Sequence, residues 1–224
     1  MADRFQIHLI TDRKSANGSS PISVSRAALR GGIDWVQLRD KAAPARETFE
    51  ATRAIATHTR RAGAGLLVND RLDVAMAAGA DGVHLAAKSL PPDAARALLG
   101  EGPLLGISVH ELGEAREAVE AGVDYVTFGH VYPTSSKPGL PPRGILELAE
   151  IVESVEVPVL AVGGIDTRNV REVLKTGCAG VAVISAIGGA PDPEPAARKF
   201  RRTLDDSGLS PRRPFKGLSQ RGAT

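Results

Sequence analysis

The sequence predicts a single (β/α)8 barrel, the TIM-barrel arrangement in which eight parallel strands alternate with eight helices. Short apolar runs rich in valine, isoleucine and leucine alternate with alanine-rich amphipathic stretches along most of the 224 residues. Such alternation is typical of βα units around a parallel sheet. Eight units can be counted, and a glycine recurs before every second strand. An open, doubly wound sheet is the alternative fold that the same pattern allows.

The strands are expected where apolar or β-branched runs are bounded by glycine, aspartate or proline, because such runs fit buried parallel strands. These runs lie at residues 5–10, 35–38, 65–69, 82–85, 104–107, 125–128, 157–162 and 180–184.

The helices are expected in the amphipathic segments between these runs, at residues 22–30, 46–62, 72–78, 92–99, 112–121, 145–154, 167–175 and 194–206. The last two carry start signals. Asp166 or Thr167 fits an N-cap, and Pro193 or Pro195 fits a first helical turn.

A weak internal repeat supports the count of eight strands. Gly32, Gly79, Gly122 and Gly177 each follow an expected helix and come shortly before an even-numbered strand. Glycine readily adopts the left-handed conformation that ends a helix and turns the chain into the next strand.

The composition is that of a globular domain, with 42% hydrophobic and 24% charged residues. We assign residues 1–206 to the barrel. Residues 207–224 form a basic tail that we expect to be disordered, since serine, proline, glycine and cations dominate it without periodicity. The tail holds four cations and no acid, so the chain's formal charge of +2 leaves −2 for residues 1–206. A barrel with this charge is not expected to bind nucleic acid.

Location and partners follow from three features of the sequence. Cys178 is the single cysteine and cannot form an internal disulfide, and no signal-length apolar run follows a basic start. No apolar run approaches the roughly 18 residues that span a bilayer. We therefore expect a cytoplasmic protein with no membrane partner that binds a small molecule, and we expect it to be a homo-oligomer.

Polar residues gather where the expected strands end, which is the end at which barrels of this kind carry their active sites. Gly163 and Gly164 follow the seventh strand, and Ser185 and Ala186 follow the eighth. Backbone N–H groups of these two loops often hold a phosphate in such barrels. We predict a phosphate site at these four residues. The simpler alternative is a tight turn followed by a capping serine.

The second and third strands end in charged residues. Arg39 and Lys41 are two residues apart on an extended segment, so both can face one side and offer cations to a phosphate or carboxylate. The alternative is a rim salt bridge to Asp40 or Asp70. Asp70 follows Asn69 and could bind a metal, but one carboxylate is a poor magnesium site without further anionic ligands. A helix N-cap is the alternative role for Asp70.

The loop after the sixth strand has the composition of an active-site loop. Residues 128–144 have the sequence FGHVYPTSSKPGLPPRG, which combines a histidine, hydroxyl groups and cations on a proline-rich segment. A histidine can take and return a proton near neutral pH, so we predict His130 as the catalytic residue. Thr134, Ser136 and Lys137 are predicted to bind the substrate.

Several motifs are similar to those of the thiamine phosphate synthase superfamily, from near residue 5 to about residue 205. They are IHLITD, VQLRDK, LLVNDRLDVAMAAGADGVHL, GISVH, FGHVYPTSSK, PVLAVGGI and GVAVISAI. The resemblance implies a (β/α)8 barrel with one of two activities. A synthase joins hydroxymethylpyrimidine diphosphate to thiazole phosphate with magnesium. A TenI-type thiazole tautomerase aromatises a carboxythiazole phosphate without a metal.

Two places in the motifs separate these activities. Ser89 stands where the resemblance to synthases implies a second metal-binding aspartate, with Lys88 before it. His130 follows Gly129 as in the tautomerase pattern. On these grounds the tautomerase is the expected function, making the protein an isomerase of thiamine biosynthesis without a cofactor, with thiazole phosphate as its partner. In this hypothesis neutral His130 moves the proton.

Gln37, Arg39, Lys41, Asn69 and Asp70 resemble residues of a synthase, and the first four are predicted to bind substrate. Ser108, at the end of the fifth strand, is also predicted to bind substrate. The first alternative is therefore a synthase, a transferase in which Asp70 helps to bind magnesium. The second alternative is a barrel that binds a thiamine precursor without turnover.

Overall fold

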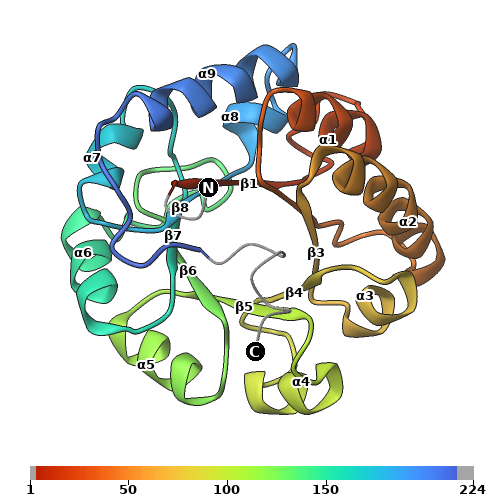
Figure 1. Ribbon diagram of the computed structural model, residues 1–224, viewed down its shortest axis with the longest axis horizontal. Helices are drawn as coiled ribbons and strands as arrows, with labels where there is room; N and C mark the ends of the chain where they lie inside the picture. The colour runs from red at the N-terminus through yellow and green to blue at the C-terminus, as the bar shows by residue number, and fades with distance from the viewer. Residues whose placement is uncertain (1–3, 216–224) are drawn as a thin grey trace.

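A computed structural model describes residues 4–215 and shows the predicted barrel (Figure 1). Eight parallel strands pair in sequence order, and β1 closes the barrel against β8. The strands are β1 (Gln6–Ile10), β2 (Trp35–Leu38), β3 (Gly65–Asn69), β4 (Gly82–Leu85), β5 (Leu104–Val109), β6 (Tyr125–Gly129), β7 (Val159–Val162) and β8 (Gly180–Val183).

The helices form a ring around the strands, as Figure 1 shows. They are α1 (Pro21–Arg30), α2 (Ala45–Ala62), α3 (Leu72–Ala78), α4 (Pro92–Leu99), α5 (Leu112–Glu120), α6 (Ile145–Ser154), α7 (Val170–Leu174), α8 (Ser185–Gly188) and α9 (Pro193–Asp205). No helix within residues 4–215 combines the length and the apolar character needed to cross a membrane.

The glycine repeat has the predicted conformation. Gly32, Gly79, Gly122 and Gly177 all have positive φ, between 65° and 93°. Each carries the chain from a helix into the strand that follows, so the count of βα units made from the repeat is confirmed.

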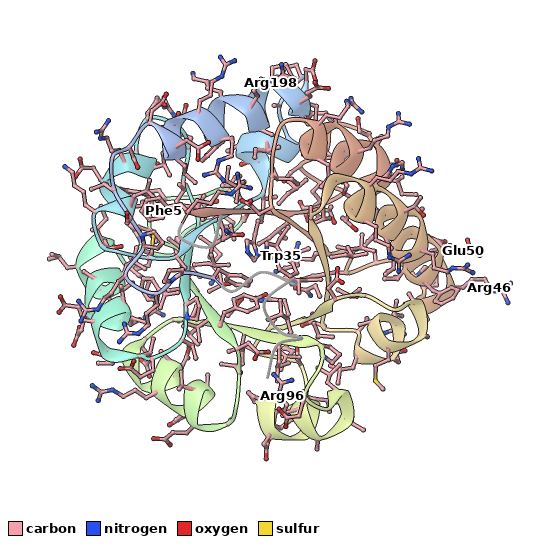
Figure 2. All side chains as sticks on the ribbon, viewed as in Figure 1. Phe5, Trp35, Arg46, Glu50, Arg96 and Arg198 are labelled. Atoms are coloured by element: carbon pink, nitrogen blue, oxygen red, sulfur yellow. The ribbon has the colours of Figure 1, made fainter. Side chains whose placement is uncertain are left out.

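Two apolar cores hold the barrel together. The larger one fills the layer between the strands and the helices, and its members include Leu9, Val36 and Phe128. The smaller one lies inside the barrel. Its members are Trp35, Leu67, Leu104, Tyr125, Leu160, Ala179 and Phe215. Figure 2 shows Trp35 at the centre of the ring, whereas Arg46 and Arg198 point outward from the helices. Side chains alternate along each strand between these two cores.

Two of the predicted elements start two or more residues later than expected, and one short helix was missed. α7 begins at Val170 after an Asn169 N-cap, not at residue 167. β7 begins at Val159, because Pro158 has no N–H group for the strand ladder. α8 follows β8 directly and was missed, since four residues are too few to show a helical period.

The expectation of a disordered tail from residue 207 does not hold for residues 207–215. Phe215 is buried in the inner core, and Arg213 pairs with Glu156 and donates to the carbonyl of Val152 at 2.7 Å. In Figure 1 the chain after α9 runs past α7 towards the middle of the barrel. Residues 216–224 lie outside the described part of the chain.

Candidate active site

A cavity of about 1040 Å³ opens at the carboxyl ends of the strands. Residues from the ends of all eight strands or the loops after them line it. All fourteen residues predicted for the site take part, namely Gln37, Arg39, Lys41, Asn69, Asp70, Ser108, His130, Thr134, Ser136, Lys137, Gly163, Gly164, Ser185 and Ala186. The structure therefore brings the predicted residues together, while their chemical roles remain predictions.

The loops after β7 and β8 form the predicted phosphate corner of this cavity. Gly163 and Gly164 have φ of 99° and 64°, a region that disfavours other residues. A Cβ atom at Gly163 would lie 2.3 Å from Cβ of His130, and one at Gly164 would lie 2.5 Å from the carbonyl oxygen of Pro133. Both positions therefore require glycine, because the loop after β6 packs directly against them.

The Gly164→Ala substitution tests this corner. The new methyl group would displace the loop after β6 and the N–H groups beside it, so we expect phosphate affinity to fall by about tenfold or more. Isothermal titration with inorganic phosphate measures the effect. Gly102→Ala is the matched control, because a Cβ there meets no atom within 4 Å. Equal phosphate affinity in both variants would contradict the predicted role.

The cations after β2 have partners other than those expected. The Arg39 guanidinium pairs with Asp12 at 2.9 Å, and Asp40 pairs with Arg13. The alternative of a salt bridge from Arg39 or Lys41 to Asp40 or Asp70 is therefore wrong. Within residues 4–215, Lys41 forms no ion pair and lines the cavity with Arg39.

Lys137 extends over the cavity from the loop after β6 and is held by a second histidine. Its Nζ lies 2.9 Å from Nε2 of His110, and Nδ1 of His110 lies 3.2 Å from the Glu114 carboxylate. This arrangement requires Nδ1 of His110 to carry the proton, so that Nε2 accepts from the ammonium group. Burial, followed by the charge of Arg143, lowers the pKa of Lys137. The ammonium group is thus oriented and partly desolvated, which strengthens its interaction with an anion.

Asp70 lies in the corner formed by β3 and β4, where both of its carboxylate oxygens are already occupied. Oδ1 accepts from the N–H of Ala86 at 3.0 Å and from the Ser89 hydroxyl, and Oδ2 accepts from Nδ2 of Asn69 at 2.6 Å. The N-cap of α3 is Arg71, so the alternative role of Asp70 as that N-cap is wrong.

Magnesium does not fit the side chains of this corner. The ion prefers several oxygen ligands, including carboxylates, and Asp70 is the one carboxylate here. Within residues 4–215, no group of three histidine, cysteine, aspartate or glutamate side chains could hold a metal ion. Lys88 and Arg71 line the same side of the cavity and add positive charge. Any magnesium bound here would depend on a substrate for most of its anionic ligands.

The Ser89→Asp substitution should create a metal site. It places a second carboxylate beside Asp70, so we expect affinity for Mg²⁺ or Mn²⁺ to rise by about tenfold or more, through the attraction between close charges. Titration of the free protein with Mn²⁺, followed by electron paramagnetic resonance, measures the change. Ser89→Asn is the control of similar size without charge, and equal Mn²⁺ affinity in the two variants would contradict the expectation.

His130 lines the cavity but is largely buried, with 5% of its surface exposed. Its Nε2 lies 3.2 Å from the carbonyl oxygen of Leu140, which requires a proton on Nε2. The backbone carbonyl of His130 accepts from the N–H of Arg143 at 2.9 Å. His130 therefore ties together the two ends of the loop that carries Lys137.

Several cavity residues were not selected from the sequence. Thr127 is buried on β6, and its hydroxyl makes no hydrogen bond to any described residue. It faces the cavity because it lies two residues from Tyr125 and from Gly129 and so shares the inner side of the strand with them, a signal that the sequence did contain. Arg71 and Arg168 also line the cavity, but each pairs with a nearby aspartate.

These features define a (β/α)8 barrel with a cavity at the carboxyl ends of its strands, lined by cations and by the glycines after β7. The chain belongs to the thiamine monophosphate synthase family, whose sequence pattern it matches over residues 7–187.

Individual relatives agree with this membership. The chain is 50% identical over 201 residues to a putative thiamine-phosphate synthase of Geobacter sulfurreducens, covering 89% of this chain and 94% of that protein. It is 46% identical over 193 residues to thiamine-phosphate synthase of Roseiflexus castenholzii, covering 86% and 85%. The solved structure of thiamine phosphate pyrophosphorylase from Pyrococcus furiosus is 40% identical, with a TM-score of 0.84 over 91% of this chain and 97% of that one.

The expected tautomerase function was wrong. Relatives that are 42–50% identical over most of their length are named as synthases or putative synthases, which are transferases and not isomerases. The 40% identical solved structure is named a thiamine phosphate pyrophosphorylase. The tautomerase interpretation gave most weight to two local departures, Ser89 and His130. Neither departure removes the predicted phosphate corner or the cations Arg39, Lys41 and Lys137. The proton transfer assigned to His130 is withdrawn with the tautomerase reaction.

Proposed function

We propose that the protein is a thiamine-phosphate synthase, which joins hydroxymethylpyrimidine diphosphate to thiazole phosphate. The observation that carries this proposal is the identity of 42–50% with five proteins named as synthases or putative synthases, over 84–89% of the chain. The cavity supports the proposal, because it offers one corner for a single phosphate and separate cations for a diphosphate.

The chemistry assigns different tasks to the two sides of the cavity. The ring nitrogen of the thiazole forms a bond to the pyrimidine methylene carbon as the bond from that carbon to the diphosphate oxygen breaks. Diphosphate leaves with the electron pair, so cations at that oxygen stabilise the transition state. In this proposal Arg39, Lys41 and Lys137 bind the diphosphate. Backbone groups of Gly163, Gly164, Ser185 and Ala186 hold the thiazole phosphate.

The remaining predicted residues complete this proposal. Gln37, Asn69, Ser108, Thr134 and Ser136 supply hydrogen bonds to the two substrates. The synthase resemblance implies magnesium, but no step is assigned to the ion because the residues around Asp70 do not form a site of their own.

A coupling assay tests the proposed function. The protein is incubated with both substrates over a range of Mg²⁺ concentrations and in the presence of a chelator, and thiamine phosphate and diphosphate are quantified. We expect both products in equal amounts. Binding of the substrates without product at any Mg²⁺ concentration would contradict the proposal and favour a barrel that binds thiamine precursors without turnover.

We further propose that the enzyme is a cytoplasmic homo-oligomer that acts on small molecules. Sedimentation equilibrium of the purified chain tests the oligomeric state, and a monomer over the micromolar range would contradict it. Fractionation of the source cells tests the location.

A further inference from the structure

Three side chains on adjacent strands form a hydrogen-bonded chain that runs from the cavity into the inner core. Nε2 of His84 on β4 lies 2.9 Å from Oγ of Ser108 on β5. Nδ1 of the same ring lies 2.9 Å from the hydroxyl oxygen of Tyr125 on β6. Ser108 lines the cavity, whereas His84 and Tyr125 are buried. The roles proposed above account for Ser108 but not for the two groups behind it.

A glycine makes this chain possible. Gly106 is the register partner of both His84 and Tyr125, so it lies between them on β5. A Cβ atom at Gly106 would lie 2.0 Å from Cζ of Tyr125 and 2.5 Å from its hydroxyl oxygen. The Tyr125 side chain therefore occupies the space of the missing side chain and reaches His84 across the strand.

The surroundings of Tyr125 decide the direction of the hydrogen bonds. The phenol lies in the inner core among Leu67, Leu104 and Leu160, and within residues 4–215 its hydroxyl has His84 as its one hydrogen-bond partner. If Nδ1 of His84 donated to the phenol, the phenolic proton would be buried without an acceptor, which is costly. Tyr125 must therefore donate to Nδ1.

The His84 ring is then restricted to a single tautomer. Burial lowers the pKa of His84 to about 4, so the ring is neutral near neutral pH and carries one proton. With Nδ1 accepting from Tyr125, that proton is on Nε2 and is donated to Oγ of Ser108. Ser108 accepts this bond, and its own proton stays available to the cavity.

We propose that Tyr125 is a positioning residue of the active site: by fixing the tautomer of His84, it makes the Ser108 hydroxyl a donor to a phosphate oxygen of the bound diphosphate. The identity of this acceptor rests on the proposed function, whereas the tautomer does not. The role is distinct from packing, because removal of one phenolic oxygen leaves the aromatic ring of Tyr125 in the core.

Nitrogen NMR of the whole protein tests the tautomer without any substrate. Imidazole ¹⁵N shifts distinguish protonated from unprotonated ring nitrogens, and the His84 signals are assigned through bonds from the backbone. We expect a protonated Nε2 and an unprotonated Nδ1 in the wild type at pH 7. In Tyr125→Phe we expect the two tautomers to be mixed. Protonation of Nδ1 in the wild type would overturn the proposal.

Binding of inorganic pyrophosphate tests the consequence for Ser108. We expect Ser108→Ala to weaken binding by about tenfold to a hundredfold, and Tyr125→Phe by about threefold to tenfold. Tyr125→Phe should have no further effect in the Ser108→Ala background, because its influence passes through that hydroxyl. Tyr132→Phe, which removes the hydroxyl of the chain's other tyrosine, is the matched control.

The outcomes separate the two proposals. Tyr125→Phe is introduced both into the wild type and into the Ser108→Ala variant. If it lowers pyrophosphate affinity by the same factor in both, its role is merely structural and the inference is overturned. If the wild type has the expected tautomer but does not bind pyrophosphate, the tautomer stands. The claim that Ser108 donates to a diphosphate oxygen is then overturned together with the proposed function.

Discussion

Replacing Lys137 with methionine is expected to lower kcat/KM for the coupling reaction by roughly a hundredfold to a thousandfold, the usual cost of removing one preorganised group that stabilises developing charge. The Nζ atom is held 2.9 Å from Nε2 of His110, and His110 is itself held by Glu114. The ammonium group thus needs little reorganisation to meet the diphosphate of the proposed reaction. Steady-state kinetics with both substrates measure the effect.

The pH dependence gives this prediction a second readout. The pKa of Lys137 is lowered by burial from the ordinary value of 10.5, so its positive charge is present below the lowered pKa and is lost as pH rises through it. Activity should therefore fall on the alkaline side at a lower pH than an ordinary lysine would give. Lys137→Arg should move this fall to higher pH, because arginine stays charged.

A control lysine separates the charge at the site from charge in general. Lys175 is exposed on the outer side of the barrel and pairs with Glu172. Lys175→Met removes the same charge and should leave kcat/KM unchanged. A Lys137→Met enzyme with activity within about threefold of the wild type would contradict the role assigned to Lys137.

The barrel and the content of its cavity could be predicted because both depend on short-range patterns. Apolar runs of strand length define β1 to β8, and the last residue of each run and those just after it must lie at the carboxyl end of the barrel. Arg39, Asn69 and Gly163 were placed correctly by this rule alone. The partners of these residues could not be predicted, since Asp12 reaches Arg39 through the packing of β1 against β2.

Single residues were a weaker guide to the chemistry of the cavity than the pattern of the strands. His130 has the chemistry of a general base, but its Nε2 proton is directed to the Leu140 carbonyl. His84 connects Ser108 in the cavity with Tyr125 in the inner core. Its position depends on the register of β4, β5 and β6 and on the gap at Gly106, which no local pattern contains.

The end of the chain was the largest error in the predicted fold, and its correction leads to a prediction on stability. The composition and the lack of periodicity predicted disorder from residue 207. A single aromatic side chain that reaches the inner core, Phe215, is enough to anchor such a segment. Phe215 packs with ring centroids 5.5 Å from Trp35, 5.1 Å from Tyr125 and 5.0 Å from His8. It closes the inner core at the end opposite the active site.

Phe215→Ala is expected to reduce the free energy of unfolding by about 3–5 kcal/mol, the usual cost of removing a buried phenylalanine and leaving a cavity. Urea unfolding followed by tryptophan fluorescence measures it, and Trp35, the chain's single tryptophan, reports directly on the inner core. Leu209→Ala is the control from the same segment, because that side chain is 38% exposed, and it should cost less than about 1 kcal/mol.

The effect of Phe215→Ala should extend to His8. Burial lowers the pKa of His8, whose two ring nitrogens have no hydrogen-bond partner among residues 4–215. Its neutral form therefore depends on exclusion of water from the inner core. Opening that core should raise the pKa of His8 towards 6.5. The folded wild type is destabilised by acid because His8 resists protonation, and the variant should be less sensitive to acid in this way. The loss of unfolding free energy caused by Phe215→Ala should therefore be larger at high pH than at low pH. If Phe215→Ala changes the free energy of unfolding by less than about 1 kcal/mol and the pKa of His8 stays lowered, residues 207–215 do not exclude water from the inner core.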